Sequence, residues 1–162
     1  MKHILPLFFL SAAVIAAPQI APTTFPTCDV PIVDRVFNPP PPDQDASPAL
    51  QAVIDELAKA GGGTIFIPAV HVRIATPIIL KEGVVLRGDF MPQYDTNNRK
   101  LGTVFDIVCG KNEPDGKPAF GVERGTGLRE LAFWYPEQNA SAPVPYPWTI
   151  YATANNCGNN FT

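Results

Sequence analysis

The stretch from residue 47 to residue 69, SPALQAVIDELAKAGGGTIFIPA, contains two hydrophobic periods in succession. In its second part, Ile65 and Ile67 alternate with other residues as on one face of a β-strand. In its first part, apolar residues recur at the spacing of one helical face, namely Leu50, Val53, Ile54, Leu57 and Ala58. The stretch therefore predicts an amphipathic helix that is followed at once by a strand.

Both ends of the predicted helix carry recognisable signals. Ser47 is a suitable N-cap, and Pro48 suits the first helical position because the N–H that proline lacks would have no partner there. The three glycines at 61–63 supply the left-handed conformation in which helices commonly end. Since they follow a helix and do not open one, they form a cap and not a phosphate-binding loop.

Short β-type runs occupy the rest of the chain, each bounded by Gly, Pro, Asn or Asp. The later runs begin near residues 84, 103, 128 and 149, a spacing of about 20 to 25 residues that is typical of stacked coils. Hairpin turns of the Asn-Gly type are absent from the sequence, which favours a parallel coil over an antiparallel sandwich. We therefore expect parallel pairing among these four runs. The runs are 64–67, 70–74, 78–80, 84–87, 103–108, 128–134 and 148–151.

Four blocks of this sequence together resemble the start of pectate-lyase-like right-handed parallel β-helix proteins. The resemblance implies an all-β solenoid of single strands, with an N-terminal helix that covers the open end of the first coil. It also identifies Gly127 to Phe133 as a further coil strand, and it covers Asp45 to about Thr162. The four blocks are ALQAVID at 49–55, GGGTIFIPA at 61–69, PIIL at 77–80 and GVVLRGD at 83–89.

The N-terminal region divides into two segments before this domain. Lys2 and His3, an apolar run from Ile4 to Leu10 and small residues up to Ala17 are typical of a secretory signal at 1–17, and the run is too short to span a membrane. The segment 18–45 is proline-rich, which favours an extended arm that contributes neither helix nor ladder to the core. The β-helix domain then occupies 46–162. We expect a secreted protein with no membrane contact once the signal is cleaved.

Charge and cysteine content exclude several classes of partner. The chain carries 15 Asp and Glu against 12 Lys and Arg without a basic cluster, so nucleic acid is excluded as a partner. The 3 cysteines, Cys28, Cys109 and Cys157, leave at least one thiol without a partner in this chain, and spacing cannot choose a pair. No two of these cysteines lie at metal-ligand spacing, and His71 is the one histidine beyond the signal, so the sequence argues against a zinc site.

The resemblance implies a polysaccharide as the partner and a lyase or a glycoside hydrolase as the activity. Active sites of this superfamily lie on the outer face of middle coils, so we expect this chain to be an N-terminal part that is inactive by itself. No cofactor is evident, although the resemblance allows calcium. The alternative is a non-catalytic β-helix adhesin or surface-structural protein. Downstream sequence discriminates the two, because only an enzyme needs charged residues clustered on successive coils.

Candidate site residues are few, and the catalytic residues stay unknown. The acids are scattered and form no pair of the kind that glycosidic hydrolysis needs. The densest aromatic patch begins at Phe133, and its Trp134 and Tyr135 are candidates for stacking on sugar rings. His71 and Arg73 share the outward face of a predicted strand, where an isolated histidine is more often surface decoration than a catalytic group.

Overall fold

The structure is a computed structural model that describes residues 33–90, 102–152 and 160–161. The predicted signal at 1–17, Cys28 and Cys157 lie outside the described residues. No helix among the described residues is long and apolar enough to cross a membrane.

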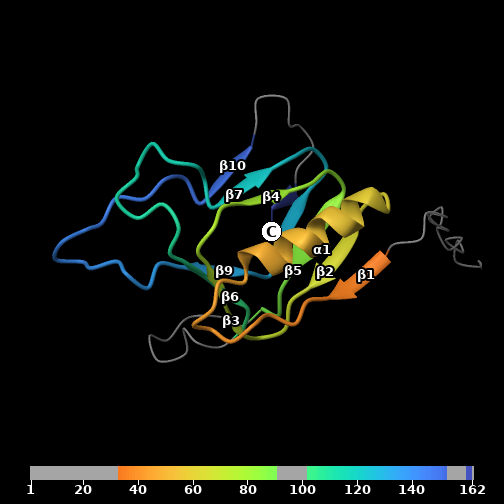
Figure 1. Cartoon of the computed structure of the whole chain (residues 1–162), viewed down its shortest axis with the longest axis horizontal. Helices are drawn as coiled ribbons and strands as arrows, with labels where there is room; N and C mark the ends of the chain where they lie inside the picture. The colour runs from red at the N-terminus through yellow and green to blue at the C-terminus, as the bar shows by residue number, and fades with distance from the viewer. Residues whose placement is uncertain (1–32, 91–101, 153–159, 162) are drawn as a thin grey trace, which may run out of the picture. The chain divides into compact units, whose positions relative to one another are not determined.

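The fold is mostly β, with three parallel sheets and one helix (Figure 1). Sheet A has the strand order β1-β2-β5-β8-β11, sheet B the order β3-β6-β9, and sheet C the order β10-β7-β4. The elements are β1 (Val33–Val36), α1 (Ser47–Lys59), β2 (Gly63–Phe66), β3 (His71–Ile74), β4 (Ile78–Leu80), β5 (Val84–Arg87), β6 (Val104–Ile107), β7 (Phe120–Val122), β8 (Gly127–Arg129), β9 (Ala132–Trp134), β10 (Ile150–Ala152) and β11 (Asn160–Phe161).

From β2 onward the chain visits the sheets in the constant order A, B, C, and every strand pair of the described residues is parallel. This order is compatible with a parallel β-solenoid that has three strands in each turn. The expectation of parallel neighbours is therefore confirmed.

The expected partners of individual runs need correction. The run 128–134 divides at Glu130, whose φ of 56° is left-handed, into β8 and β9, which pair with β5 and β6. The runs near 84 and 103 lie in different sheets, and β10 pairs with β7, a strand that the sequence did not reveal. The runs that the spacing of about 20 to 25 residues relates lie in different sheets. Pairing requires strands of the same sheet, which the chain reaches again only after a full turn.

The core lies between the three sheets, where inward residues of successive strands stack in register. In sheet A the buried row is Ile65, Leu86 and Leu128, because these residues face one another across β2, β5 and β8. A cluster of aromatic rings joins sheets B and C: the centroid of Phe105 lies 5.1 Å from that of Phe120 and 5.9 Å from that of Phe133. Such tilted contacts are favourable beyond the area that they bury.

Helix α1 covers one end of this core and packs against β2, β4 and β5 (Figure 1). Leu50, Ile54 and Leu57 on its apolar face are at most 1% exposed, and Val53 packs against the same cluster while remaining partly exposed. The predicted helix is thus confirmed, and Leu50, Ile54 and Leu57 are buried against the core. Without this helix the apolar residues at this end of the core would face water.

The N-terminus of α1 is organised differently from the expectation. The N-cap residue is Ala46, which makes no side-chain cap, and Ser47 is already the first helical residue. The carboxylate of Asp45 replaces the expected cap: its Oδ1 accepts hydrogen bonds from the Ser47 N–H at 3.0 Å and from the Ala75 N–H at 3.1 Å. Its Oδ2 accepts one from the Thr76 hydroxyl at 2.9 Å. Asp45 therefore fastens the helix to the turn between β3 and β4.

The glycine turn after α1 lets the helix end approach Gly83, just before β5, closely. The Gly62 N–H donates to the Leu57 carbonyl at 2.9 Å, and the Gly63 N–H donates to the Gly83 carbonyl at 3.1 Å. Gly62 has a φ of +105°, and a Cβ atom there would lie 2.5 Å from the Gly83 oxygen. Glycine is therefore required at 62 both by backbone conformation and by space.

The proline-rich segment 18–45 was expected to contribute no ladder, and the structure corrects this for its described part. Val33–Val36 forms β1 and pairs in parallel with β2, so that sheet A continues past the capping helix. The local reason is that this short stretch is free of proline and contains β-branched residues, although prolines precede and follow it.

Replacing Leu57 by Ala should reduce the free energy of unfolding by about 2 to 5 kcal/mol, because the substitution leaves a cavity beneath the capping helix. Urea denaturation followed by circular dichroism measures the change. Val53→Ala is the matched control, and its smaller effect follows from its partial exposure. Equal losses in the two variants would contradict the packing described above.

Asp45 should make the stability of the fold depend on pH. Burial alone would raise the pKa of the Asp45 carboxyl, but the hydrogen bonds from Ser47, Ala75 and Thr76 outweigh it and hold the pKa below its ordinary value. A lowered folded pKa contributes stability above the unfolded pKa of about 3.9, and this contribution is lost as the pH falls through the folded pKa.

Asp45→Ala should therefore cost about 0.5 to 2 kcal/mol at neutral pH, and the difference from the wild type should shrink in acid. Denaturation midpoints measured from about pH 2 to about pH 7 test this, because that range brackets the titration of carboxyl groups. Asp43→Ala, which removes an exposed carboxylate, provides the control. This variant should lose stability in acid as the wild type does.

Candidate functional site

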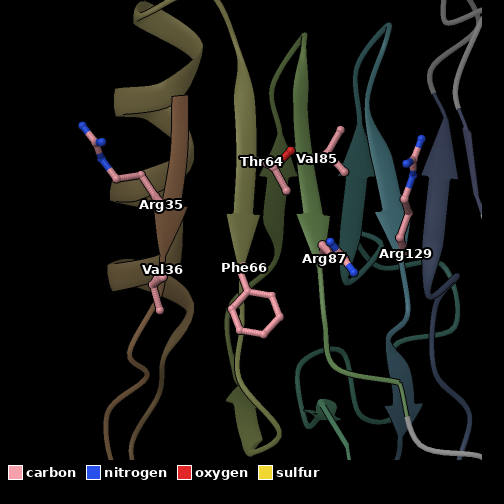
Figure 2. A pocket seen from close by; sticks show the side chains of 7 residues that line it. All are labelled: Arg35, Val36, Thr64, Phe66, Val85, Arg87 and Arg129. Atoms are coloured by element: carbon pink, nitrogen blue, oxygen red, sulfur yellow. The ribbon is translucent and has the colours of Figure 1, made fainter. Parts of the chain in front are cut away.

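A groove of about 470 Å³ lies on the outer face of sheet A. Parallel register places four of its residues in one row across four strands: Val36 faces Phe66, Phe66 faces Arg87, and Arg87 faces Arg129. Figure 2 shows these side chains on neighbouring strands, with Arg87 between Phe66 and Arg129. The full lining is Arg35, Val36, Thr64, Phe66, Val85, Arg87 and Arg129.

The groove is positively charged along the row. Like charges on directly opposed residues repel, and the Glu130 carboxylate moderates this repulsion by accepting a hydrogen bond from the Arg87 Nε at 2.8 Å. Arg35 points away from the row (Figure 2) and pairs with Glu56 of α1 at 3.2 Å. Arg129 pairs with no carboxylate of the described residues. Its guanidinium is a fork of donors suited to a bound carboxylate.

The sequence contains a signal for this row that the patterns considered above do not include. The pair Leu-Arg occurs at 86–87 and again at 128–129, so in each strand a buried leucine precedes an outward arginine. Only the register of β5 and β8 shows that the two arginines are neighbours, because 42 residues separate them in number (129 − 87).

The outer face of sheet B carries a second polar group, His71 with Asp106. The Nδ1 atom of His71 lies 3.0 Å and 2.9 Å from the two carboxylate oxygens of Asp106. Both side chains are partly buried, at 25% and 17% exposure, and the buried Nε2 of His71 has no hydrogen-bond partner among the described residues. Asp106 thus orients the imidazole, and His71 is not the surface decoration that the sequence suggested. Neither residue lines the groove on sheet A.

The aromatic candidates occupy two different environments. Trp134 is 42% exposed and lies in the same register row of sheet B as Asp106. Tyr135 is partly buried: its ring meets that of Tyr146 at a centroid distance of 4.7 Å, and its hydroxyl bonds to that of Thr149. The exposed Trp134 keeps a face on which a sugar could stack, whereas Tyr135 mainly supports the loop that follows it. Sugar contact by these two residues stays a prediction.

Five glutamates of the described residues are engaged with cations. Salt bridges of 2.7 to 3.2 Å hold Glu56, Glu82, Glu123, Glu130 and Glu137. No group of three or more His, Cys, Asp or Glu among the described residues could hold a metal ion, so these residues do not fit calcium. Cys109 is a buried thiol without a disulfide, and burial raises its pKa.

One comparison with known proteins found a similar sequence. The chain is similar to the mannuronan C5-epimerase AlgE1 of Azotobacter vinelandii. The two sequences are 42% identical over an alignment of 111 residues, and the match covers 62% of this chain. The chain spans about 7% of the length of that curated relative. No protein-family model matches the sequence, and no solved structure matches it.

Asp106→Ala should lower the free energy of unfolding by about 1 to 3 kcal/mol, because it leaves both nitrogens of a partly buried imidazole without partners. Denaturation of the single variants, of His71→Ala and of the double variant forms a cycle that isolates the pair. Glu130→Ala, which removes an exposed ion pair with Arg87, should cost less than about 1 kcal/mol. Additive effects of Asp106→Ala and His71→Ala would show that the pair contributes nothing.

Proposed function

We propose that this chain is the N-terminal part of a secreted, pectate-lyase-like right-handed parallel β-helix protein that acts on an acidic polysaccharide. The observation that carries the proposal is the row formed by Phe66, Arg87 and Arg129 on the outer face of sheet A. An aromatic ring beside two guanidinium groups suits a sugar that carries a carboxylate, since the ring offers an apolar face and arginine binds carboxylates through paired hydrogen bonds.

Three further features support this proposal. The constant order of sheets A, B and C is the order that a solenoid of three strands per turn requires. The similarity to a protein named for mannuronan, a polymer of uronic acid, supports an acidic sugar as the ligand of the groove. The secretory signal expected at 1–17 would deliver the protein to the extracellular space, where such polymers are found.

The reaction type is proposed only at the level of polysaccharide modification. A lyase or an epimerase needs a group that removes a proton next to a carboxylate, and a hydrolase needs two carboxyl groups about 5 to 9.5 Å apart on either side of the bond. His71 is an imidazole oriented by Asp106, but its remaining nitrogen Nε2 is buried, and the residue lies on sheet B and not in the groove. We therefore assign the groove a binding role, and we expect binding without turnover from this chain alone.

A non-catalytic adhesin is the second candidate, because the described residues of the groove include arginines and no carboxylate or histidine. The longer reading frame discriminates the two candidates. An enzyme should present further charged residues in register with Arg87 and Arg129 on later strands, whereas an adhesin should not.

Arg129→Gln should weaken the binding of mannuronan oligosaccharides by about 3- to 10-fold, because it removes a charge-assisted hydrogen bond at an exposed site. Isothermal titration calorimetry at two salt concentrations measures the loss, and the difference should diminish at high salt. Arg124→Gln is the matched control, since Arg124 pairs with Glu82 and does not line the groove. Equal losses in the two variants, or equal binding of a neutral glucan, would overturn the proposed function.

A further inference from the structure

Two loops leave the sheets at the same point of successive repeats. Residues 108–119 connect β6 to β7, and residues 135–149 connect β9 to β10, so both run from sheet B to sheet C. The equivalent connection of the first repeat, between β3 and β4, needs only residues 75–77. Figure 1 shows both long loops reaching away from the sheets on the left. We call them the paired loops.

The paired loops are held to each other at several points. The Asn112 N–H donates to the Pro145 carbonyl at 2.9 Å, and the Lys111 ammonium lies 2.9 Å from a carboxylate oxygen of Glu137. At Gly110 a Cβ atom would lie 2.6 Å from the ring of Pro147, so the Gly110 backbone closely approaches that ring. Long loops that are ordered in this way, without adding to a sheet, commonly carry function.

The longer loop is also ordered internally. The Gln138 side chain accepts a hydrogen bond from the Val144 N–H at 3.1 Å and donates one to the Val144 carbonyl at 2.7 Å. The Tyr146 ring packs edge-on against that of Tyr135, and its buried hydroxyl has no hydrogen-bond partner among the described residues. The loop is therefore preorganised, which reduces the entropy that binding costs.

These contacts leave a tryptophan exposed beside a hollow. Trp148 is 73% exposed, and together with Pro114, Tyr146 and Pro147 it lines a hollow of about 330 Å³. This volume is at the lower end of the range of small-molecule sites, about 300 to 1,000 Å³. A broad apolar face at the edge of such a hollow suits the C–H face of a pyranose ring.

The charge of the hollow distinguishes it from the groove on sheet A. Its lining residues carry no charge, and the nearby Lys111 is neutralised by Glu137. The groove, by contrast, contains Arg129. The hollow therefore offers stacking without selection for a carboxylate.

We infer that the hollow beside Trp148 is a second glycan-binding site, which holds one pyranose ring by stacking and acts separately from the arginine groove. The inference rests on the proposed function, and it places a contact outside the groove. Binding there depends on the apolar face of the sugar, and so it is insensitive to salt, unlike binding to Arg129.

The experiment uses the fact that the full chain contains 2 tryptophans, Trp134 and Trp148. Trp134→Phe leaves Trp148 as the sole indole emitter, and Trp148→Phe leaves Trp134. Mannuronan oligosaccharides should change the emission of the first variant, in which Trp148 is the emitter. The change should persist between low and high salt, and oligosaccharides whose carboxylates are methyl-esterified should produce it as well.

Affinity provides the second readout. Trp148→Ala should weaken oligosaccharide binding by about 3- to 10-fold at high salt, with an unchanged circular dichroism spectrum because the side chain is exposed. A response of Trp134 alone would overturn the inference in favour of the exposed face of sheet B. A response of Trp148 to a peptide of residues 18–32, but not to sugar, would overturn it in favour of the proline-rich segment.

The two proposals fail in distinguishable ways. Binding that depends on Arg129 while the emission of Trp148 stays constant would remove the second site and leave the proposed function intact. A change at Trp148, together with a low-salt affinity that Arg129→Gln leaves unaltered, would support the hollow and remove the groove. Absence of binding to every oligosaccharide would contradict both.

Discussion

Parallel strands that pair in register place each side chain directly beside its counterpart on the next strand, about 4.8 Å away. The core depends on this constraint, since a shift by one residue would turn Ile65, Leu86 or Leu128 toward water. The outer face obeys the same geometry. Because the leucines of β5 and β8 are aligned inside, Arg87 and Arg129 are necessarily aligned outside, and the groove is a consequence of the packing.

A stack of parallel strands exposes its apolar core at each end, and in this structure one end is covered. Helix α1 covers the apolar core at this end with Leu50, Ile54 and Leu57, while β1 extends sheet A alongside it. The helix is positioned by Asp45 at its start and by Gly62 at its end. Asp45 joins the helix to the turn between β3 and β4, and Gly62 joins it to Gly83 before β5. The helix and the sheets therefore stabilise one another.

The surfaces proposed to bind polysaccharide differ in the physical origin of their rigidity. The arginine groove is carried by strands whose inward residues are fully buried, so its spacing is that of the sheet. The hollow at Trp148 is carried by loops, and its geometry depends on the contacts of Lys111 with Glu137 and of Asn112 with Pro145. The first surface selects charge and the second an apolar face, and a polymer of uronic acid presents both.

The sequence by itself determined the capping helix, most strands and their inward faces, because hydrophobic period and glycine position are local properties of the chain. It did not determine that Glu130 would split one run into two strands, or which strands would be neighbours. The site depended almost wholly on the tertiary structure. Arg87 meets Arg129, and His71 meets Asp106, only because connections of unequal length return the chain to the same sheet in register.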